Sequence, residues 1–179
     1  MEKLFKLLSD AQASLFVLFH KTWVYHWNVV GKDFQQLHTL FGSQYETIFE
    51  EIDRLSEHMR YLNVKPLSSL KRVLEVSKID EASSSANDES MISDLLQSNI
   101  DFCDIMSQIS EEAEKQKSYA TANLVQDLME SHGKFVWMLR SFSDNTSKKV
   151  EETFVIDETE TELTEIEYAE NSIEESIEE

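Results

Sequence analysis

The chain has 179 residues, of which 41% are hydrophobic and 10% aromatic, and this is enough apolar material for one domain with a buried core. Its formal charge is −19, which argues against a general nucleic-acid-binding protein. The chain shows no signal-peptide pattern and no run of the roughly 20 apolar residues that a membrane span needs. With a single cysteine, Cys103, it fits a reducing compartment, and we expect a cytoplasmic protein that does not contact membranes.

Three glycines and one proline leave few turn formers, so the composition predicts long helices. The first is expected over residues 3–29, where apolar residues recur at helical spacing, and Gly31 ends it. The second is expected from Asp33, a suitable N-cap, to residue 62. A short connecting helix is expected within 66–79.

A polar loop follows the short helix, and the third long helix is expected over residues 91–117. Asp88 or Ser90 is the expected cap of this helix. Asn99 interrupts its apolar stripe, and we expect the neighbouring Ile100 to take the core position there.

The fourth long helix is expected over residues 119–142. The intervals predict an all-α fold, a four-helix bundle with a short extra helix between the second and third helices. We assign residues 1–147 to this bundle and 148–179 to an acidic C-terminal tail. From residue 151 onward the chain has 13 acidic residues and no Lys or Arg, so the tail is expected to be disordered. The alternative is an amphipathic segment that folds on a partner or on the bundle.

The candidate metal ligands are His26, His38, Asp53 and Glu57. Asp53 and Glu57 are one helical turn apart and share a face, which is most often a solvated arrangement but also suits a metal with oxygen and imidazole ligands. In a continuous helix His38 and Asp53 lie roughly 22 Å apart, too far to bind one metal from the same chain. A second copy packed antiparallel about a two-fold axis near residues 45 and 46 would bring them together, so a shared site predicts a symmetric dimer.

The remaining histidines are expected to be structural or surface residues. No histidine is preceded by glutamate three residues earlier, so the Glu-x-x-His motif of metal sites inside a single bundle is absent from the sequence. A site within one subunit is therefore disfavoured. The histidines expected to be structural or surface residues are His20, His58 and His132.

Three stretches resemble the Dps proteins, the mini-ferritins of the ferritin-like superfamily, over residues 3–145. They are YHWNVVGKDFQQLH (25–38), FGSQYETIFEEIDRLSE (41–57) and ATANLVQDLMESHGKFVWMLRSF (120–142). The resemblance implies a homo-oligomeric shell, a dodecamer built from two-fold dimers. It also implies ferroxidase activity, the oxidation of Fe²⁺ preferentially by hydrogen peroxide, with storage of ferric iron and protection against oxidative damage.

Carried over by motif, the resemblance implies that His26 and His38 bind iron from one subunit and that Asp53 and Glu57 bind it from the partner. Zinc is expected to compete for the same ligands. Trp27 would lie beside the site, in either a packing or a redox role.

The chain departs from the family pattern at three positions. Gly42 stands where many members have an aspartate that helps to hold a second iron, so that iron should bind more weakly. His58 and Asn123 replace an arginine and an acid. The alternative function is therefore an oligomeric Dps-like shell with weakened ferroxidase activity that acts as a structural or partner-binding protein. Without a lysine-rich N-terminal extension, and with an acidic tail, tight DNA binding is not expected.

Overall fold

The computed structural model describes residues 1–143, so the expected tail at 148–179 lies outside the described residues and its boundary stays a prediction. The described part is all-α and confirms the predicted bundle with its short extra helix. The helices are α1 (Glu2–Asn28), α2 (Phe34–Tyr61), α3 (Leu70–Val76), α4 (Asp88–Lys115) and α5 (Tyr119–Arg140).

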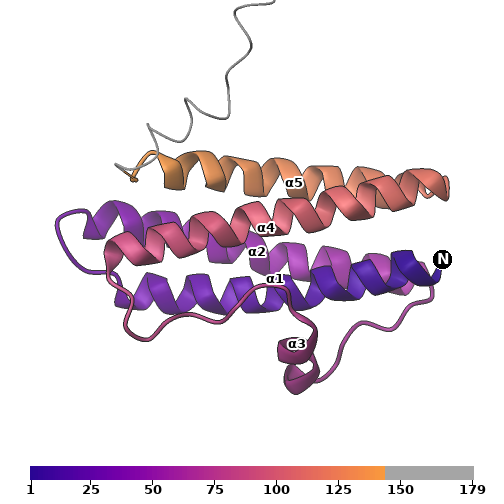
Figure 1. Ribbon diagram of the computed structural model, residues 1–179, viewed down its shortest axis with the longest axis horizontal. Helices are drawn as coiled ribbons and strands as arrows, with labels where there is room; N and C mark the ends of the chain where they lie inside the picture. Colours follow the sequence, from indigo (N-terminus) through magenta and orange to yellow (C-terminus); the bar gives the residue numbers. More distant parts are fainter. Residues whose placement is uncertain (144–179) are drawn as a thin grey trace, which may run out of the picture. The chain divides into compact units, whose positions relative to one another are not determined.

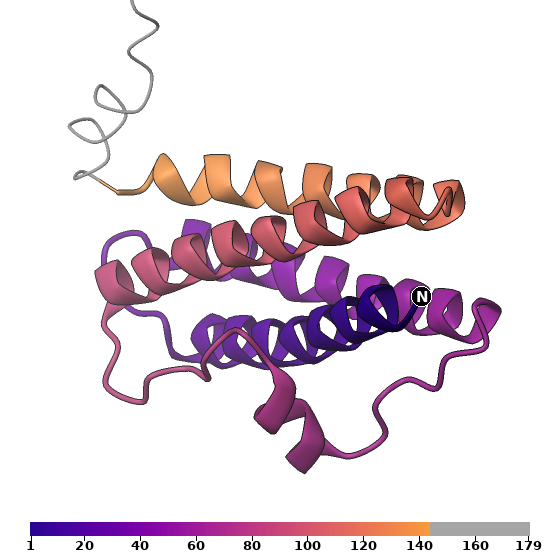
Figure 2. The ribbon, with the colours of Figure 1, turned by 45° about the vertical axis from the view of Figure 1, so that its right-hand side comes forward.

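The four long helices form two antiparallel pairs, α1 with α2 and α4 with α5 (Figures 1 and 2). The long connection that carries α3 brings the chain back along the bundle, so α4 runs in the same direction as α2 (Figure 1). This is the single long crossover of ferritin-like bundles. The connection packs α3 against α1, and α1 also packs against α4.

The starts of α2 and α4 differ in their side-chain capping. The second long helix begins directly after Asp33, as predicted, although the Asp33 side chain makes no capping hydrogen bond. For α4 the expected caps were wrong, because Asp88 and Ser90 both lie inside its first turn. The cap is Asn87, whose Oδ1 accepts a hydrogen bond of 2.9 Å from the backbone N–H of Ser90. An asparagine oxygen at this position satisfies one of the unpaired donors of the first turn.

The expectation for Asn99 was also wrong, since Asn99 is fully buried and Ile100 only half-buried. Asn99 Nδ2 donates to the Leu95 carbonyl oxygen at 2.6 Å, which leaves its Oδ1 free to accept. That oxygen lies 2.7 Å from Nδ1 of His132 and 3.0 Å from Nε2 of Gln44. A side chain with partners on three helices can occupy the core, where an unpaired amide would be costly.

We call this group the core polar cluster; its members are Gln44, Glu51, Asn99 and His132. Nε2 of His132 lies 2.9 Å from Oε2 of Glu51, so the cluster joins α2, α4 and α5 through fully buried hydrogen bonds. Because Asn99 Oδ1 only accepts, the Nδ1 atom of His132 carries a proton.

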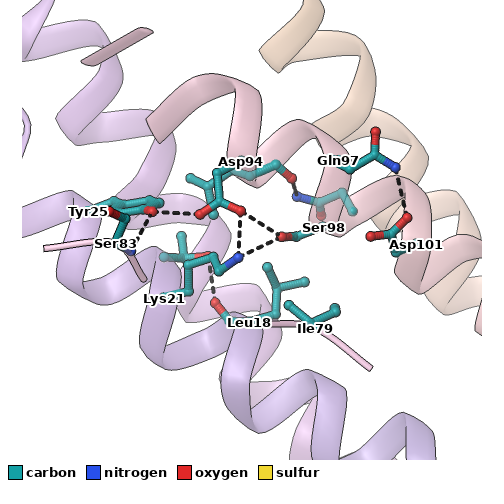
Figure 3. Close-up of polar contacts among 12 residues, drawn as sticks. Leu18, Lys21, Tyr25, Ile79, Ser83, Asp94, Gln97, Ser98 and Asp101 are labelled. Atoms are coloured by element: carbon teal, nitrogen blue, oxygen red, sulfur yellow. Dashed lines mark hydrogen bonds and ion pairs between the residues drawn. The ribbon is translucent and has the colours of Figure 1, made fainter. Parts of the chain in front are cut away.

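A second buried polar group ties α1 to α4 (Figure 3). Lys21 is only 1% exposed, and its Nζ lies 2.6 Å from Oδ1 of Asp94 and 3.0 Å from Oγ of Ser98. Tyr25 donates its hydroxyl hydrogen to Oδ2 of Asp94 at 2.6 Å and accepts one from the backbone N–H of Ser83 at 3.1 Å. Burial, and then the hydrogen bond to Asp94, raise the pKa of Tyr25 to about 12.

Replacing Asp94 by asparagine should lower the free energy of unfolding by about 2 kcal/mol, because the buried Lys21 ammonium loses its counter-charge. The matched control is Asp104→Asn, which removes an exposed carboxylate from the same helix. Urea unfolding at one fixed protein concentration measures both variants, since any self-association would make the measured stability depend on concentration. Equal losses in the two variants would show that Lys21 does not need Asp94.

The raised pKa of Tyr25 predicts an alkaline loss of stability. The unfolded phenol, with a pKa near 10, releases its proton first, whereas the native phenol keeps it until about pH 12. The contribution is therefore complete below pH 10 and falls as the pH rises from about 10 to 12. We expect Tyr25→Phe to flatten the stability profile in this window, while Tyr61→Phe, at an exposed tyrosine, leaves it unchanged.

Candidate metal centre

His26 and His38 meet where α1 and α2 join. His26 lies in the last turn of α1 and His38 in the second turn of α2. The connection between the helices is short, and Gly31 adopts a φ of 107° in it, a conformation that side-chain-bearing residues rarely adopt. The turn folds α2 back on α1, so the two imidazole rings stack with their centroids 3.8 Å apart and an interplanar angle of 18°.

The two histidines hold each other through their backbones. Nδ1 of His26 lies 2.7 Å from the carbonyl oxygen of His38, and Nδ1 of His38 lies 2.8 Å from the carbonyl oxygen of His26. A carbonyl oxygen only accepts, so both Nδ1 atoms carry the hydrogen. In each neutral ring Nε2 therefore has the free lone pair, so the backbone contacts leave Nε2 as the nitrogen of each histidine that is available to a metal.

The absence of a side chain at Gly42 allows the His26 ring to pack closely against α2. A Cβ at this position would lie 3.2 Å from Cε1 and 3.4 Å from Nδ1 of His26, closer than side chains normally approach. The imidazole therefore packs directly on the bare backbone of α2 at position 42. Any side chain at position 42 would require the His26 ring to shift by a few tenths of an ångström.

The two candidate carboxylates lie elsewhere on the same subunit. Asp53 and Glu57 are exposed on α2, one turn apart, and the unbroken helix separates Asp53 from His38 by roughly 22 Å. Within residues 1–143 no group of three or more His, Cys, Asp or Glu side chains is placed to hold a metal ion. Within residues 1–143 the candidate ligands thus form two separate pairs, a histidine pair and an acidic pair, and we call each pair a half-site of the candidate metal centre.

A partly exposed cluster of aromatic rings lies beside the histidine pair. Ring centroids are 5.5 Å apart for Phe19 and Trp23 and 5.9 Å apart for Phe19 and Phe49. Phe49 is 63% exposed, and a hollow of about 300 Å³ opens among these side chains. We call this group the aromatic face; its members are Phe19, Trp23, Trp27, Tyr45 and Phe49. Trp27 and Phe49 are its exposed members.

The other titratable candidates are placed outside the half-sites. His20 is exposed, His132 belongs to the core polar cluster, and Nε2 of His58 lies 2.8 Å from Oγ1 of Thr121. Burial lowers the pKa of His58, which favours its neutral form. Cys103 is half-buried, and burial raises its pKa to about 11, so the thiol stays protonated at neutral pH.

The core polar cluster is the feature that sequence reasoning missed. The sequence does show polar residues at core-facing positions of three predicted helices. Only the contacts show that these positions face one another.

No helix within residues 1–143 combines the length and the apolar character that crossing a bilayer demands.

The ferritin-like domain family model matches residues 5–149. A low temperature-induced protein of Nostoc, itself uncharacterised, is 32% identical over 138 residues, which cover 76% of this chain and 77% of that protein. The DNA protection during starvation protein of Helicobacter pylori is 28% identical over 140 residues, 78% of this chain and 97% of that protein.

The fold agrees with these relationships. The crystal structure of the Dps protein from Vibrio cholerae, described as a member of a broad superfamily of ferritin-like diiron-carboxylate proteins, superposes with a TM-score of 0.75 at 29% identity. The match covers 79% of this chain and 89% of that one. The chain therefore belongs to the ferritin-like domain family and, within it, to the Dps proteins.

Proposed function

We propose that this protein oxidises ferrous iron with hydrogen peroxide and keeps the ferric product inside a hollow homo-oligomer, a dodecamer, thereby limiting oxidative damage. The observation that carries the proposal is the division of the candidate ligands into two half-sites on each chain. Iron is the substrate of this reaction and also the stored product.

Two half-sites become one site when two subunits pair. An antiparallel pairing of α2 helices about an axis near residues 45 and 46 would bring the histidine pair of one subunit to the acidic pair of the other. The half-buried Tyr45 and the exposed Phe49 of the aromatic face lie between His38 and Asp53 along α2, so the same pairing would bury more of both rings. Burial of apolar area is the main favourable contribution to such an association.

The donor set fits iron. The Nε2 atoms of His26 and His38 are borderline ligands, and the carboxylates of Asp53 and Glu57 are hard, anionic ligands. Carboxylate charge stabilises Fe³⁺ more than Fe²⁺ and so favours oxidation at the site. Zinc suits the same donors without redox chemistry and should act as a competitor.

A complementation experiment tests the shared site. His26→Ala/His38→Ala and Asp53→Ala/Glu57→Ala subunits should each lose fast ferrous oxidation, because each pure oligomer has only incomplete sites. Mixed dimers regain one intact site of two, so randomly reassembled oligomers should recover about a quarter of the wild-type rate. Peroxide-driven ferric absorbance after anaerobic loading measures the rate.

The matched control mixes wild-type subunits with a Glu111→Ala/Glu114→Ala variant, which lacks two exposed acids on α4, and should keep the full rate. A mixture of the two site variants that stays inactive, although it assembles, would rule out a site shared in this way.

The second candidate function is a Dps-like shell with weak oxidation that acts as a structural or partner-binding protein. Gly42 favours it, because the site has no carboxylate at that position. Wild-type oxidation no faster than that of Asp53→Ala/Glu57→Ala would exclude fast oxidation at the candidate site and would favour this alternative.

The charge balance predicts that the intact protein does not retard duplex DNA in a gel at physiological salt. Each chain carries a formal charge of −19, and an oligomer multiplies it, so phosphate is repelled. Lowering the salt should not create binding, since fewer ions would screen the repulsion. A clear shift at physiological salt would contradict the prediction.

A further inference from the structure

Tyr45 occupies a particular place in the aromatic face. Its ring lies edge-on to the His26 imidazole, with centroids 5.2 Å apart and an interplanar angle of 70°. On another side it lies 6.1 Å from the Trp23 ring, which is 4.5 Å from that of Trp27. A run of oxidisable rings thus begins beside a candidate iron ligand.

The proposed reaction has an electron-counting problem at this site. Reduction of hydrogen peroxide to water takes two electrons, and one ferrous ion supplies one. A second iron bound nearby would supply the other electron, but Gly42 offers no side-chain ligand for it. Without another donor, one-electron reduction of peroxide releases a hydroxyl radical.

We propose that Tyr45 supplies the second electron; this inference rests on the proposed function. In the first step H₂O₂, Fe²⁺, the Tyr45 phenol and one H⁺ give Fe³⁺, the Tyr45 phenoxyl radical and two H₂O. The phenol is oxidised by one electron, and its O–H proton is released. In the second step another Fe²⁺ and one H⁺ restore the phenol and give a second Fe³⁺.

The surroundings of Tyr45 suit this role. Oxidation of a phenol is easier when a base takes its proton, and Oε1 of Glu46 lies 3.5 Å from the Tyr45 hydroxyl. The ring is half-buried against Phe19, Trp23 and His26, so packing holds it beside the site. Phenylalanine could make the same ring contacts, which means that the hydroxyl distinguishes an electron donor from a packing residue.

The test uses the intact oligomer with one ferrous ion per site and one equivalent of hydrogen peroxide, frozen within milliseconds. Electron paramagnetic resonance should show a tyrosyl radical in the wild type. We expect Tyr45→Phe to reduce this signal at least about five-fold and to raise hydroxyl-radical spin adducts several-fold. The matched control is Tyr61→Phe, an exposed tyrosine on the same helix, which should change neither signal.

The outcomes separate this inference from the proposed function. Fast oxidation that Asp53→Ala/Glu57→Ala abolishes, with a tyrosyl signal and spin-adduct yield unchanged in Tyr45→Phe, would overturn the role of Tyr45 and leave the ferroxidase intact. Absence of fast oxidation in the wild type would overturn both. Circular dichroism and oligomer size, expected to match the wild type in Tyr45→Phe, confirm that the comparison is between folded shells.

Discussion

The arrangement of the two candidate histidine ligands depends on two backbone carbonyl groups. Those of His26 and His38 each hold the imidazole of the other residue at 2.7–2.8 Å, and the exchange locks the end of α1 to the start of α2. Because each carbonyl is itself part of a helix, the orientation of both rings follows from the helical backbone rather than from flexible neighbours. The bare backbone of Gly42 and the edge of Tyr45 then complete the surroundings of the His26 ring.

Inside the bundle, buried polar groups determine how the helices align. The core polar cluster links α2, α4 and α5, and the Lys21–Asp94 pair links α1 and α4. Sliding any of these helices by one turn would leave buried donors and acceptors unpaired, at a cost of about 1–3 kcal/mol for each group. Apolar packing alone distinguishes less sharply between one helix alignment and the next, since leucine and isoleucine side chains can pack in several alignments. The candidate ligands on α2, which are His38, Asp53 and Glu57, therefore occupy defined positions relative to the other helices.

The sequence predicted the parts of the fold that depend on local pattern. Apolar periodicity and the scarcity of turn formers located all four long helices to within a few residues, and the short extra helix followed from the interval around residues 66–79. The burial of Asn99 was predicted wrongly, because a polar residue in an apolar stripe is normally taken as an exposed interruption. Its buried position is understood only when its partners, His132 and Gln44, are known. Those partners lie 33 and 55 residues away along the chain, beyond the reach of periodicity.

For the candidate metal centre, the sequence predicted the separation of the candidate ligands along the helix but not the local geometry of the histidine rings. Helical rise alone separated His38 from Asp53 and so divided the candidate ligands into two pairs. The stacking of His26 on His38, their tautomers and the contact with Gly42 depend on how the turn at Gly31 folds α2 against α1. Spacing along a sequence carries no information about that angle.

The proposed metal site shared between subunits has a consequence for each newly made molecule. A newly made subunit, folded but alone, would hold neither a complete ligand set nor a covered aromatic face. Ferrous iron that reached it would meet imidazoles without carboxylates or carboxylates without imidazoles, and would leave unoxidised. Oxidation would then begin only after subunits have paired, so that ferric iron is formed beside a shell that can enclose it.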